Sequence, residues 1–269
     1  MNARYEIRGL IAEGGGGTVH LGWDRQTNCE VAIKRAAGAD AVEALMSEAA
    51  VLRRIQHPNI VSILDAGTDE HGAYIVMELA GRQTLDDIVS RRPLAQNEFE
   101  QLVIQTLGGI IAAHAVNVMH LDLKPENIMV ETDEPGHLRI KILDFGVAGL
   151  SAQSRHTDQS ASGPVMGSLF FMAPERFDRE PGDARSDLYS LGCVYYFALT
   201  GQPPFRGEIA PQVMVAHLRH QFTPLAEIRT DLPAFIQQWV EWLLSRKPED
   251  RPADASIALA AFQQCRIPA

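Results

Sequence analysis

Two short polar motifs constrain this chain more than any other feature. The first reads His-Leu-Asp-Leu-Lys-Pro-Glu-Asn and ends at Asn127, and the second reads Asp-Phe-Gly and begins at Asp144. Between them lie two apolar segments and a turn-rich linker, at 127–130, 138–143 and 131–137 respectively. This pattern predicts an antiparallel hairpin with a long loop. Because the first residue of one hairpin strand lies beside the last residue of the other, we expect Asn127 and Asp144 to meet in space.

These two residues would supply oxygen ligands for a metal ion. An amide oxygen and a carboxylate form a hard-oxygen pair that suits Mg²⁺, which takes its remaining ligands from water and substrate phosphates. Asp122 precedes Asn127 by five residues and would lie at the rim of the same site. In the alternative interpretation, Asp122 and Asp144 are ordinary turn residues and Phe145 belongs to the core. The presence of both motifs in this order favours the site.

The first motif resembles the catalytic loop of the eukaryotic-type, or Hanks-type, serine/threonine protein kinases. Lys124 within Asp-Leu-Lys-Pro-Glu-Asn is typical of that branch and is normally absent from tyrosine kinases. The resemblance extends over nearly all of residues 5–262. It implies an α+β, two-lobed fold, with a small antiparallel sheet and one key helix in residues 1–80. A mostly helical lobe would follow in residues 81–269, with Gly81 as the hinge.

Two residues of the first lobe are candidates for binding phosphate. Residues 31–34 have strand character, which gives Ala32 and Lys34 a common face because side chains alternate along a strand. Helical periodicity over 41–56 turns Glu48 toward an apolar stripe, where a buried carboxylate needs a partner. The resemblance implies that Ala32 leaves room for adenine, and that Lys34 reaches the α- and β-phosphates of ATP and pairs with Glu48. The alternative is a glutamate at the edge of the stripe that points into water.

Four consecutive glycines end at Gly17. Glycine lets a backbone lie close over phosphates and offer N–H groups to anionic oxygens, although a glycine run alone also fits an ordinary flexible loop. Its place before residues 31–34 resembles the nucleotide-covering loop of the family. The residues that this implies for nucleotide contact are Ile11, Gly14, Gly17 and Val19. Ala12 replaces the first glycine of the family pattern, which we expect to change nucleotide affinity modestly at most, and the glycine run should stay mobile until nucleotide binds.

Residues 74–81 resemble the strand and hinge that join the two kinase lobes. By position, Met77 would be the gatekeeper, and the backbones of Glu78 and Ala80 would bond the adenine edge. Met129 completes the residues that the resemblance assigns to the nucleotide. A buried strand with methionine as a gap-filler is the simpler interpretation, and both can hold at once.

Residues 167–175 are similar to the close of the family's activation segment. Ser168 stands where threonine is commoner, and its hydroxyl would bond Asp122 and Lys124. Leu169 replaces the usual proline, which puts the neighbouring specificity pocket in doubt.

Two further residues have structural roles in the family. The resemblance implies that Glu175 pairs with Arg251 and that Asp187 braces the backbone of the catalytic loop. Residues 186–201 begin with cap-type residues, stop at glycine and are apolar nearly all round, as expected of a central buried helix. This helix is too short to cross a bilayer, which needs about 20 apolar residues. The second lobe should contain helices at 98–116, 187–199, 213–220, 233–245 and 254–264.

The most consequential departure from the family is Leu121, which stands where arginine commonly binds a phosphorylated activation loop. Leucine cannot bind phosphate. We therefore hypothesise that activity does not depend on a phosphate docked beside the catalytic base. Four hydroxyl residues nevertheless lie in that segment: Ser154, Thr157, Ser160 and Ser162.

Charge and composition limit the partners. Lysine and arginine number 24 against 34 aspartates and glutamates, a net charge of −10 that argues against a nucleic-acid surface and favours basic protein substrates. With 46% hydrophobic residues, the 269-residue chain can bury a sizeable core. Cys29, Cys193 and Cys265 show neither disulfide nor metal spacing, and nothing near Met1 resembles a signal peptide. We therefore expect a cytoplasmic protein with no membrane segment.

The resemblance implies direct transfer of the γ-phosphoryl group of ATP to a serine or threonine hydroxyl of a protein. Asn127 and Asp144 would hold Mg²⁺, or Mn²⁺ in its place. Lys34 would position the phosphates and Lys124 would steady the transferring group. Asp122 would orient the hydroxyl and accept its proton.

Two other classes of function stay open. A catalytically silent, kinase-like scaffold would fit the departures at Ala12, Leu121 and Leu169, although every residue assigned to catalysis is present. Small-molecule phosphotransferases also have a His-x-Asp motif followed by a later asparagine, but they lack the Ala-Pro-Glu segment and the sequence motif around Asp187. The sequence also leaves open the physiological substrate, the upstream regulator, the oligomeric state and membership of a longer protein. Whether Phe145 and the helix around Glu48 rest in the active arrangement is open too.

Overall fold

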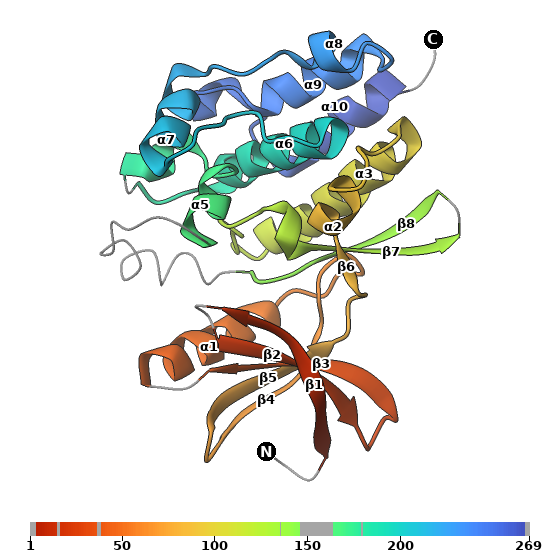
Figure 1. Ribbon diagram of the computed structural model, residues 1–269, viewed down its shortest axis with the longest axis vertical. Coiled ribbons are helices and arrows are strands. Elements are labelled where there is room, and N and C mark those ends of the chain that lie inside the picture. The colour runs from red at the N-terminus through yellow and green to blue at the C-terminus, as the bar shows by residue number, and fades with distance from the viewer. Residues whose placement is uncertain are drawn as a thin grey trace.

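The chain folds into one part built mainly of strands and one built mainly of helices (Figure 1). The computed structural model describes residues 4–14, 17–36, 39–134, 136–145, 164–178 and 180–266. In Figure 1 the strand-rich lobe lies below the helical lobe, and the connection between them runs beside β6. The predicted α+β, two-lobed architecture is confirmed.

The N-terminal lobe is a five-stranded antiparallel sheet with one helix packed against it. The strands are β1 (Tyr5–Gly14), β2 (Gly17–Asp24), β3 (Cys29–Ala36), β4 (Ile63–Asp69) and β5 (Gly72–Glu78), in the spatial order β1-β2-β3-β5-β4. Helix α1 (Ala39–Leu52) packs against β3, β4 and β5. Its inner face consists of Leu45, Ala49 and Leu52, which are fully buried at the predicted spacing.

Helix α1 ends at Leu52, earlier than the predicted end at residue 56. Beyond Leu52 a backbone hydrogen bond spans three residues instead of the four of an α-helix: the Arg54 N–H donates to the carbonyl of Val51. Pro58 follows shortly, and the residue before a proline avoids the helical region. Ile55 is buried in the core from a turn rather than from a helix, which explains why the apolar pattern continued past the helix end.

The second lobe is mostly helical. Its elements are β6 (Gln83–Thr84), α2 (Leu85–Val89), α3 (Gln96–His114), η1 (Pro125–Asn127), β7 (Ile128–Glu134), β8 (His137–Ile142), α5 (Pro164–Leu169), η2 (Pro174–Asp178), α6 (Ala184–Thr200), α7 (Ala210–Arg219), α8 (Leu225–Ile228), α9 (Ala234–Leu243), η3 (Pro248–Asp250) and α10 (Ala255–Arg266). The predicted long helices all exist, with ends shifted by up to three residues. The elements that we did not predict, β6, α2, α5, α8 and the 3₁₀ turns η1, η2 and η3, are too short to show a periodic pattern.

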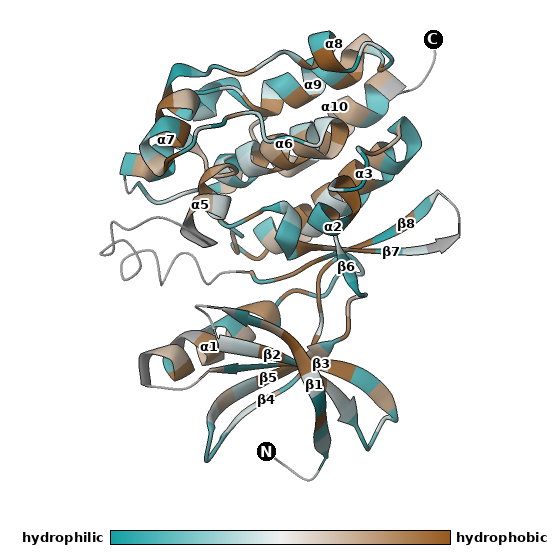
Figure 2. Ribbon diagram, in the orientation of Figure 1, coloured by the Kyte–Doolittle hydropathy of each residue, from teal (hydrophilic) through white to brown (hydrophobic). Residues whose placement is uncertain are grey.

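Helix α6 forms the centre of the second lobe. It is buried from Ser186 through Leu199, and Figure 2 shows it among the other helices of this lobe. The helix starts before the predicted residue 187, because the Asp183 carboxylate caps it by accepting hydrogen bonds from the backbone N–H groups of Arg185 and Ser186. It ends at Gly201, whose φ of 75° is the left-handed conformation that terminates helices.

The hairpin after the catalytic loop brings the two polar motifs together. Ile128 on β7 pairs with Ile142 on β8, and the backbone N–H of Leu143 donates to the carbonyl of Asn127 at 2.9 Å. Asp144 is the next residue, so the predicted meeting of Asn127 and Asp144 at the hairpin base is confirmed. The predicted long loop is wrong, because β7 continues with polar residues to Glu134.

The segment before β4 fastens the first lobe to the second. The Ile142 N–H donates to the Asn59 carbonyl at 2.8 Å, and the Val61 N–H donates to the Ile142 carbonyl at 3.0 Å. The Asn59 side chain also donates to the Ile140 carbonyl at 2.9 Å. A side-chain contact adds to these, since Lys141 Nζ lies 2.6 Å from Glu78 Oε1. These contacts at the base of the hairpin therefore fix the position of one lobe relative to the other.

Candidate active site

A cleft of about 350 Å³ lies between the lobes. It is lined by Ile11, Val19, Leu21, Ala32, Lys34, Val61, Met77, Glu78, Leu79, Ala80, Gly81, Arg82, Met129, Leu143 and Asp144. Most residues that the sequence assigned to nucleotide lie in this lining. Among the described residues, Gly14, Gly17 and Glu48 are assigned residues that do not line it.

Sequence reasoning missed four apolar residues of the cleft, Leu21, Val61, Leu79 and Leu143. The period of a strand could have identified Leu21, because it lies two residues after Val19 and shares its face. Leu79 lies between the assigned Glu78 and Ala80. Val61 and Leu143 lie outside the motifs, and only the tertiary arrangement brings them to the cleft.

Lys34 occupies the polar end of the cleft between two carboxylates. Its Nζ lies 2.8 Å from Glu48 Oε1 and 2.9 Å from Asp144 Oδ1. The Glu48 side chain is 2% exposed, whereas that of Asp144 is 42% exposed. One ammonium group thus links strand β3, helix α1 and the second polar motif, and the Asp144 carboxylate keeps an accessible side.

Burial and charge determine the protonation of this cluster. Burial opposes the charge of Lys34, but Asp144 and Glu48 raise its pKa above the ordinary value, so the lysine stays protonated. Burial raises the pKa of Glu48 to about 7 in spite of the neighbouring lysine. For Asp144, burial also opposes ionisation, but Lys34 holds its pKa below the ordinary value. Asp144 is therefore the carboxylate that carries a full negative charge toward the cleft.

Phe145 and helix α1 adopt the inward arrangement, which the sequence left open. Phe145 is fully buried, with its ring centroid 4.6 Å from that of His120. His120 Nε2 lies 2.8 Å from the Leu143 carbonyl oxygen, which ties the first motif to the second. Together with the contact between Lys34 and Glu48, this arrangement brings residues of both lobes to one site.

Helix α6 fixes the backbone of the catalytic loop. Asp187 accepts the backbone N–H of His120 at 2.8 Å and that of Leu121 at 2.7 Å. Its Oδ2 also lies 2.8 Å from His114 Nε2 on α3. The Asp187 side chain has no solvent exposure, and these contacts satisfy a charge that burial would otherwise make costly.

The loop also carries a group of polar side chains that contact one another. Lys124 Nζ donates to Ser168 Oγ at 2.9 Å and lies 3.2 Å from Asp122 Oδ2. The Asn127 amide nitrogen donates to the Asp122 backbone carbonyl at 2.8 Å. This bond fixes the orientation of the amide, with its nitrogen toward the loop.

A buried ion pair holds the segment that follows the active site. Arg251 donates to Glu175 from both terminal nitrogens, at 2.8 and 2.9 Å, and the Ser186 hydroxyl donates to Glu175 at 2.7 Å. The Arg251 side chain has no exposed surface. Burial would raise the pKa of Glu175, but Arg251 and Ser186 keep it below its ordinary value. The fork of a guanidinium suits such a bidentate contact.

Comparison with known proteins agrees with this geometry. A family model described as the protein kinase domain matches residues 5–263. The chain belongs to the protein kinase family. The kinase domain is 35% identical over 279 residues to serine/threonine-protein kinase pkn3 of Myxococcus xanthus, covering 97% of this chain and 49% of pkn3. It is 32% identical over 271 residues to serine/threonine-protein kinase PknH of Mycobacterium tuberculosis, covering 98% of this chain and 42% of PknH. The chain thus spans about half the length of the curated relatives it matches, or less.

A solved structure shares the fold of the kinase domain. A crystal structure of Rad53 in complex with AMP-PNP is similar to it, with a TM-score of 0.80 and 26% sequence identity. The similarity covers 96% of this chain and 65% of that one. Within the described residues, we found no helix long and apolar enough to span a membrane.

The donor set of the kinase domain fits magnesium. Asn127 offers an amide oxygen and Asp144 an accessible carboxylate, and hard oxygen ligands in small number suit an ion that retains water and binds phosphate. Among the residues that the structure describes, no group of three or more histidine, cysteine, aspartate or glutamate side chains is placed to hold a metal ion.

Some predicted features of the kinase domain lie outside the described residues. They are Gly15 and Gly16 of the glycine run, Gly146 of the second motif, and the hydroxyl residues Ser154, Thr157, Ser160 and Ser162.

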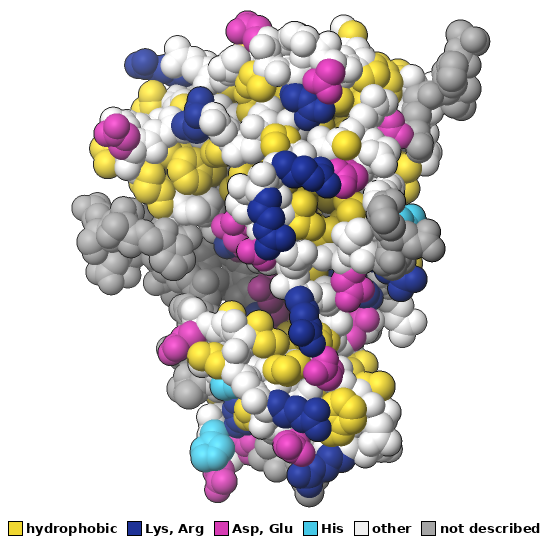
Figure 3. Space-filling view, turned by 45° about the vertical axis from the view of Figure 1, so that its right-hand side comes forward, with side chains coloured by type: hydrophobic (Ala, Val, Ile, Leu, Met, Phe, Trp, Pro, Cys, Tyr) yellow, Lys and Arg dark blue, Asp and Glu magenta, His cyan; other side chains and the backbone are white. Residues whose placement is uncertain are grey.

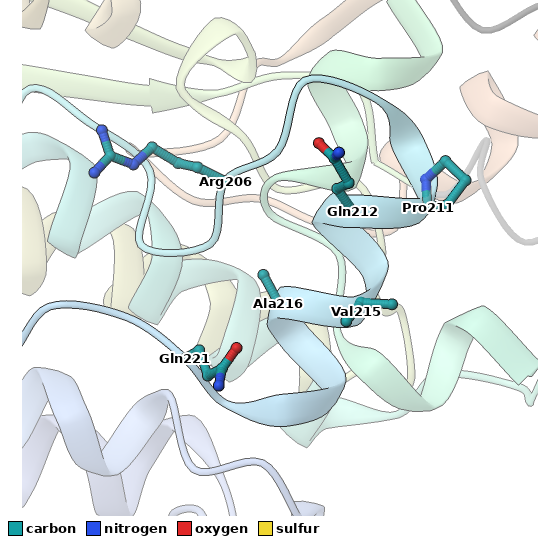
Figure 4. Close-up of a pocket in the computed structure, with 6 residues that line it drawn as sticks. All are labelled: Arg206, Pro211, Gln212, Val215, Ala216 and Gln221. Carbon is teal, nitrogen blue, oxygen red and sulfur yellow. The ribbon is translucent and has the colours of Figure 1, made fainter.

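A second hollow of the kinase domain lies on and beside α7, where its lining comes from that helix and the loops at its two ends (Figure 4). Its lining residues are Arg206, Pro211, Gln212, Val215, Ala216 and Gln221. None of these six residues is an acid or a nucleophile.

Proposed function

We propose that this kinase domain transfers the γ-phosphoryl group of ATP to serine or threonine hydroxyls of proteins. The observation that carries the proposal is the position of Lys34 between Glu48 and Asp144 at one end of an apolar cleft. The names of the curated relatives, which are serine/threonine-protein kinases, support the choice of hydroxyl, as does Lys124 in the catalytic loop.

The cleft would take the nucleotide with its base between the lobes. Ala32 and Met77 on neighbouring strands would enclose the adenine ring, with Val19 above it and Met129 below. The backbones of Glu78 and Ala80 would bond its edge. Lys34 would meet the α- and β-phosphates, and Glu48 fixes its ammonium group in place. The remaining nucleotide contacts would come from Ile11, Gly14 and Gly17. The AMP-PNP in the Rad53 complex supports a nucleotide in this fold.

Magnesium would bind at the base of the hairpin. Asn127 and Asp144 would hold it, and when bound it would neutralise the negative charge of the phosphates. Mn²⁺ would fit the same oxygen ligands. Lys34 keeps Asp144 ionised, which favours a cation there.

The transfer itself would depend mainly on positioning and charge, since phosphoryl transfer asks little covalent chemistry of the protein. Asp122 would orient the acceptor hydroxyl and accept its proton. Lys124, held by Ser168 at 2.9 Å, would steady the transferring group. The bond between Asn127 and the Asp122 carbonyl links the base to the metal site.

We further propose that activity does not require a phosphate on the activation segment. The support is Leu121, which offers an apolar side chain where the family commonly places a phosphate-binding arginine. Its neighbours in space are Gly182 and the side chain of Arg176. The catalytic loop is instead braced by protein groups, among them Asp187.

We place the boundary between the lobes after residue 80, with Gly81 as the hinge. Gly81 has a φ of 91°, and a Cβ added there would lie 2.7 Å from Glu131 Cγ. A larger residue would strain this turn.

On the face shown in Figure 3, lysine and arginine side chains lie among aspartate and glutamate side chains, with no separate basic area. Protein substrates rather than nucleic acids therefore remain the proposed partners.

Incubation with γ-labelled ATP, Mg²⁺ and a generic basic protein tests the proposal. We expect label on protein serine or threonine with the parent chain and none with Asp122→Asn. Binding of ATP without transfer would favour the kinase-like scaffold instead. Label on a small molecule alone would favour the phosphotransferase.

A further inference from the structure

Leu121 has a strained backbone directly before the proposed catalytic base. Its φ is 61°, in the left-handed region that leucine rarely adopts. Such a conformation persists only where surrounding contacts fix it. Since Asp122 is the next residue, whatever holds Leu121 also determines the direction in which the Asp122 carboxylate points.

Both polar backbone groups of Leu121 are held by charged side chains. Its N–H donates to Asp187 Oδ1 at 2.7 Å, and its carbonyl accepts from Arg176 Nη1 at 2.5 Å. Asp187 comes from the central helix α6, whereas Arg176 comes from η2 at the end of the activation segment. The strained residue therefore lies between two elements that are far apart in the sequence.

Neighbouring residues fix the position of Arg176. It follows Glu175, which is fixed by the buried Arg251. Its aliphatic stem and the Leu121 side chain share the space left by Gly182, because a Cβ added to Gly182 would lie 3.0 Å from Arg176 Cδ and 2.6 Å from Leu121 Cδ2. An arginine at position 121 would bring a second guanidinium group into the same space. Leucine avoids this repulsion and leaves the Leu121 carbonyl to Arg176.

We infer that Arg176 is a positioning residue for phosphoryl transfer, acting on Asp122 through the carbonyl of Leu121. It connects the end of the activation segment to the catalytic loop by a contact within the protein, without a phosphate group. This inference rests on the proposed kinase activity. It assigns Arg176 no contact with nucleotide, so its effect belongs to the transfer step and not to ATP binding.

The test is the kinetics of Arg176→Met, which keeps the aliphatic stem and removes the hydrogen-bond donors. We expect kcat to fall about tenfold to a hundredfold, as for loss of one charged hydrogen bond. The KM for ATP and the ATP affinity measured by calorimetry should stay within twofold of the parent. Arg176→Lys keeps a cation and should restore part of kcat. Arg219→Met, on the exposed surface of α7, is the matched control and should behave like the parent.

Two results would overturn the inference. One is a kcat for Arg176→Met equal to that of Arg219→Met. The other is a parallel loss of kcat, ATP affinity and melting temperature that Arg176→Lys does not relieve, since this would mean a general structural role. If Arg176→Met does not fold, Arg176→Lys serves as the test, with an expected two- to tenfold fall in kcat. A parent chain without transfer activity would overturn the proposed function itself, which is a distinguishable result.

Discussion

The ammonium group of Lys34 and the carboxylate of Glu48 form an ion pair at 2.8 Å between strand β3 and helix α1. This pair places the lysine at the phosphate end of the cleft, where it also reaches Asp144. The Glu48 side chain is only 2% exposed, so the pair ties helix α1 to strand β3 inside the protein. The relationship makes Lys34 the first residue to test.

Lys34→Met should abolish most phosphoryl transfer while leaving the fold intact. The methionine fills the space of the lysine stem, and Glu48, whose pKa is already raised to about 7 by burial, can take up a proton in place of its lost partner. Transfer from γ-labelled ATP and thermal unfolding check the two halves of this expectation. Retention of more than a tenth of the parent rate would contradict the role of Lys34.

Asp122→Ala should lower kcat by about 10²-fold to 10⁴-fold if proton acceptance is its main role. Removing the carboxylate takes away the base and leaves the bond from Asn127 to the Asp122 backbone carbonyl available. The metal site should therefore survive, and Mg²⁺-dependent ATP binding measured by calorimetry should change little. A fall in kcat of less than tenfold would show that Asp122 is not the base.

Removal of the four activation-segment hydroxyls should leave turnover nearly unchanged. The variant carries alanine at Ser154, Thr157, Ser160 and Ser162. The expectation follows from Leu121, which cannot bind a phosphate beside the catalytic base. The measurement is kcat for this variant, set beside the parent chain before and after treatment with a phosphatase. A hundredfold drop in either comparison would refute independence from phosphorylation.

The sequence was most informative where the chemistry lies in short motifs. Asn127 and Asp144 could be placed together from a hairpin pattern alone, because the two ends of a hairpin are neighbours by construction. The distance between Lys34 and Glu48 needed the family resemblance, since nothing in a strand and a helix pattern fixes how they pack. The resting arrangement of Phe145 could not be predicted at all, because it depends on the packing of the whole core.

Two of the structural features that were missed depend on tertiary contacts. The left-handed backbone of Leu121 has no signal in the sequence, because leucine does not favour that conformation. The contact of Arg176 with its carbonyl joins two loops that meet only in the folded chain. The early start of α6 was in principle readable from Asp183, a good capping residue, but Ser186 and Asp187 offered an equally suitable start.

Arg251→Met should destabilise the fold by about 3–5 kcal/mol, the range for breaking a buried ion pair from one side. Arg251 has no exposed side-chain surface and is the bidentate partner of Glu175, whose side chain is 12% exposed and would lose both guanidinium donors. Urea unfolding measures the change. Arg25→Met is the control, because its partner Glu6 is 44% exposed and the expected loss is below about 1 kcal/mol. Equal losses in the two variants would contradict the structural role of the buried pair.

Stability should fall in mild acid because of His217. This residue is fully buried, its Nδ1 lies 2.8 Å from the Tyr189 hydroxyl, and burial lowers its pKa from 6.5 to about 3, with a smaller contribution from His220. The unfolded chain would take up a proton below pH 6.5, whereas the folded chain would not do so until about pH 3. The unfolded state therefore binds more protons in this window, and stability decreases as the pH falls through it.

Relative to pH 7, His217 should lower the free energy of unfolding by about 2 kcal/mol at pH 5. His217→Gln keeps an acceptor for Tyr189 but does not titrate, so its stability should change less between these two pH values. Urea unfolding of both chains at pH 7 and pH 5 gives the comparison. His71→Gln is the matched control, because its side chain is 70% exposed and its removal should leave the pH dependence as in the parent. The same pH dependence in His217→Gln and the parent would rule out His217 as the source of acid sensitivity.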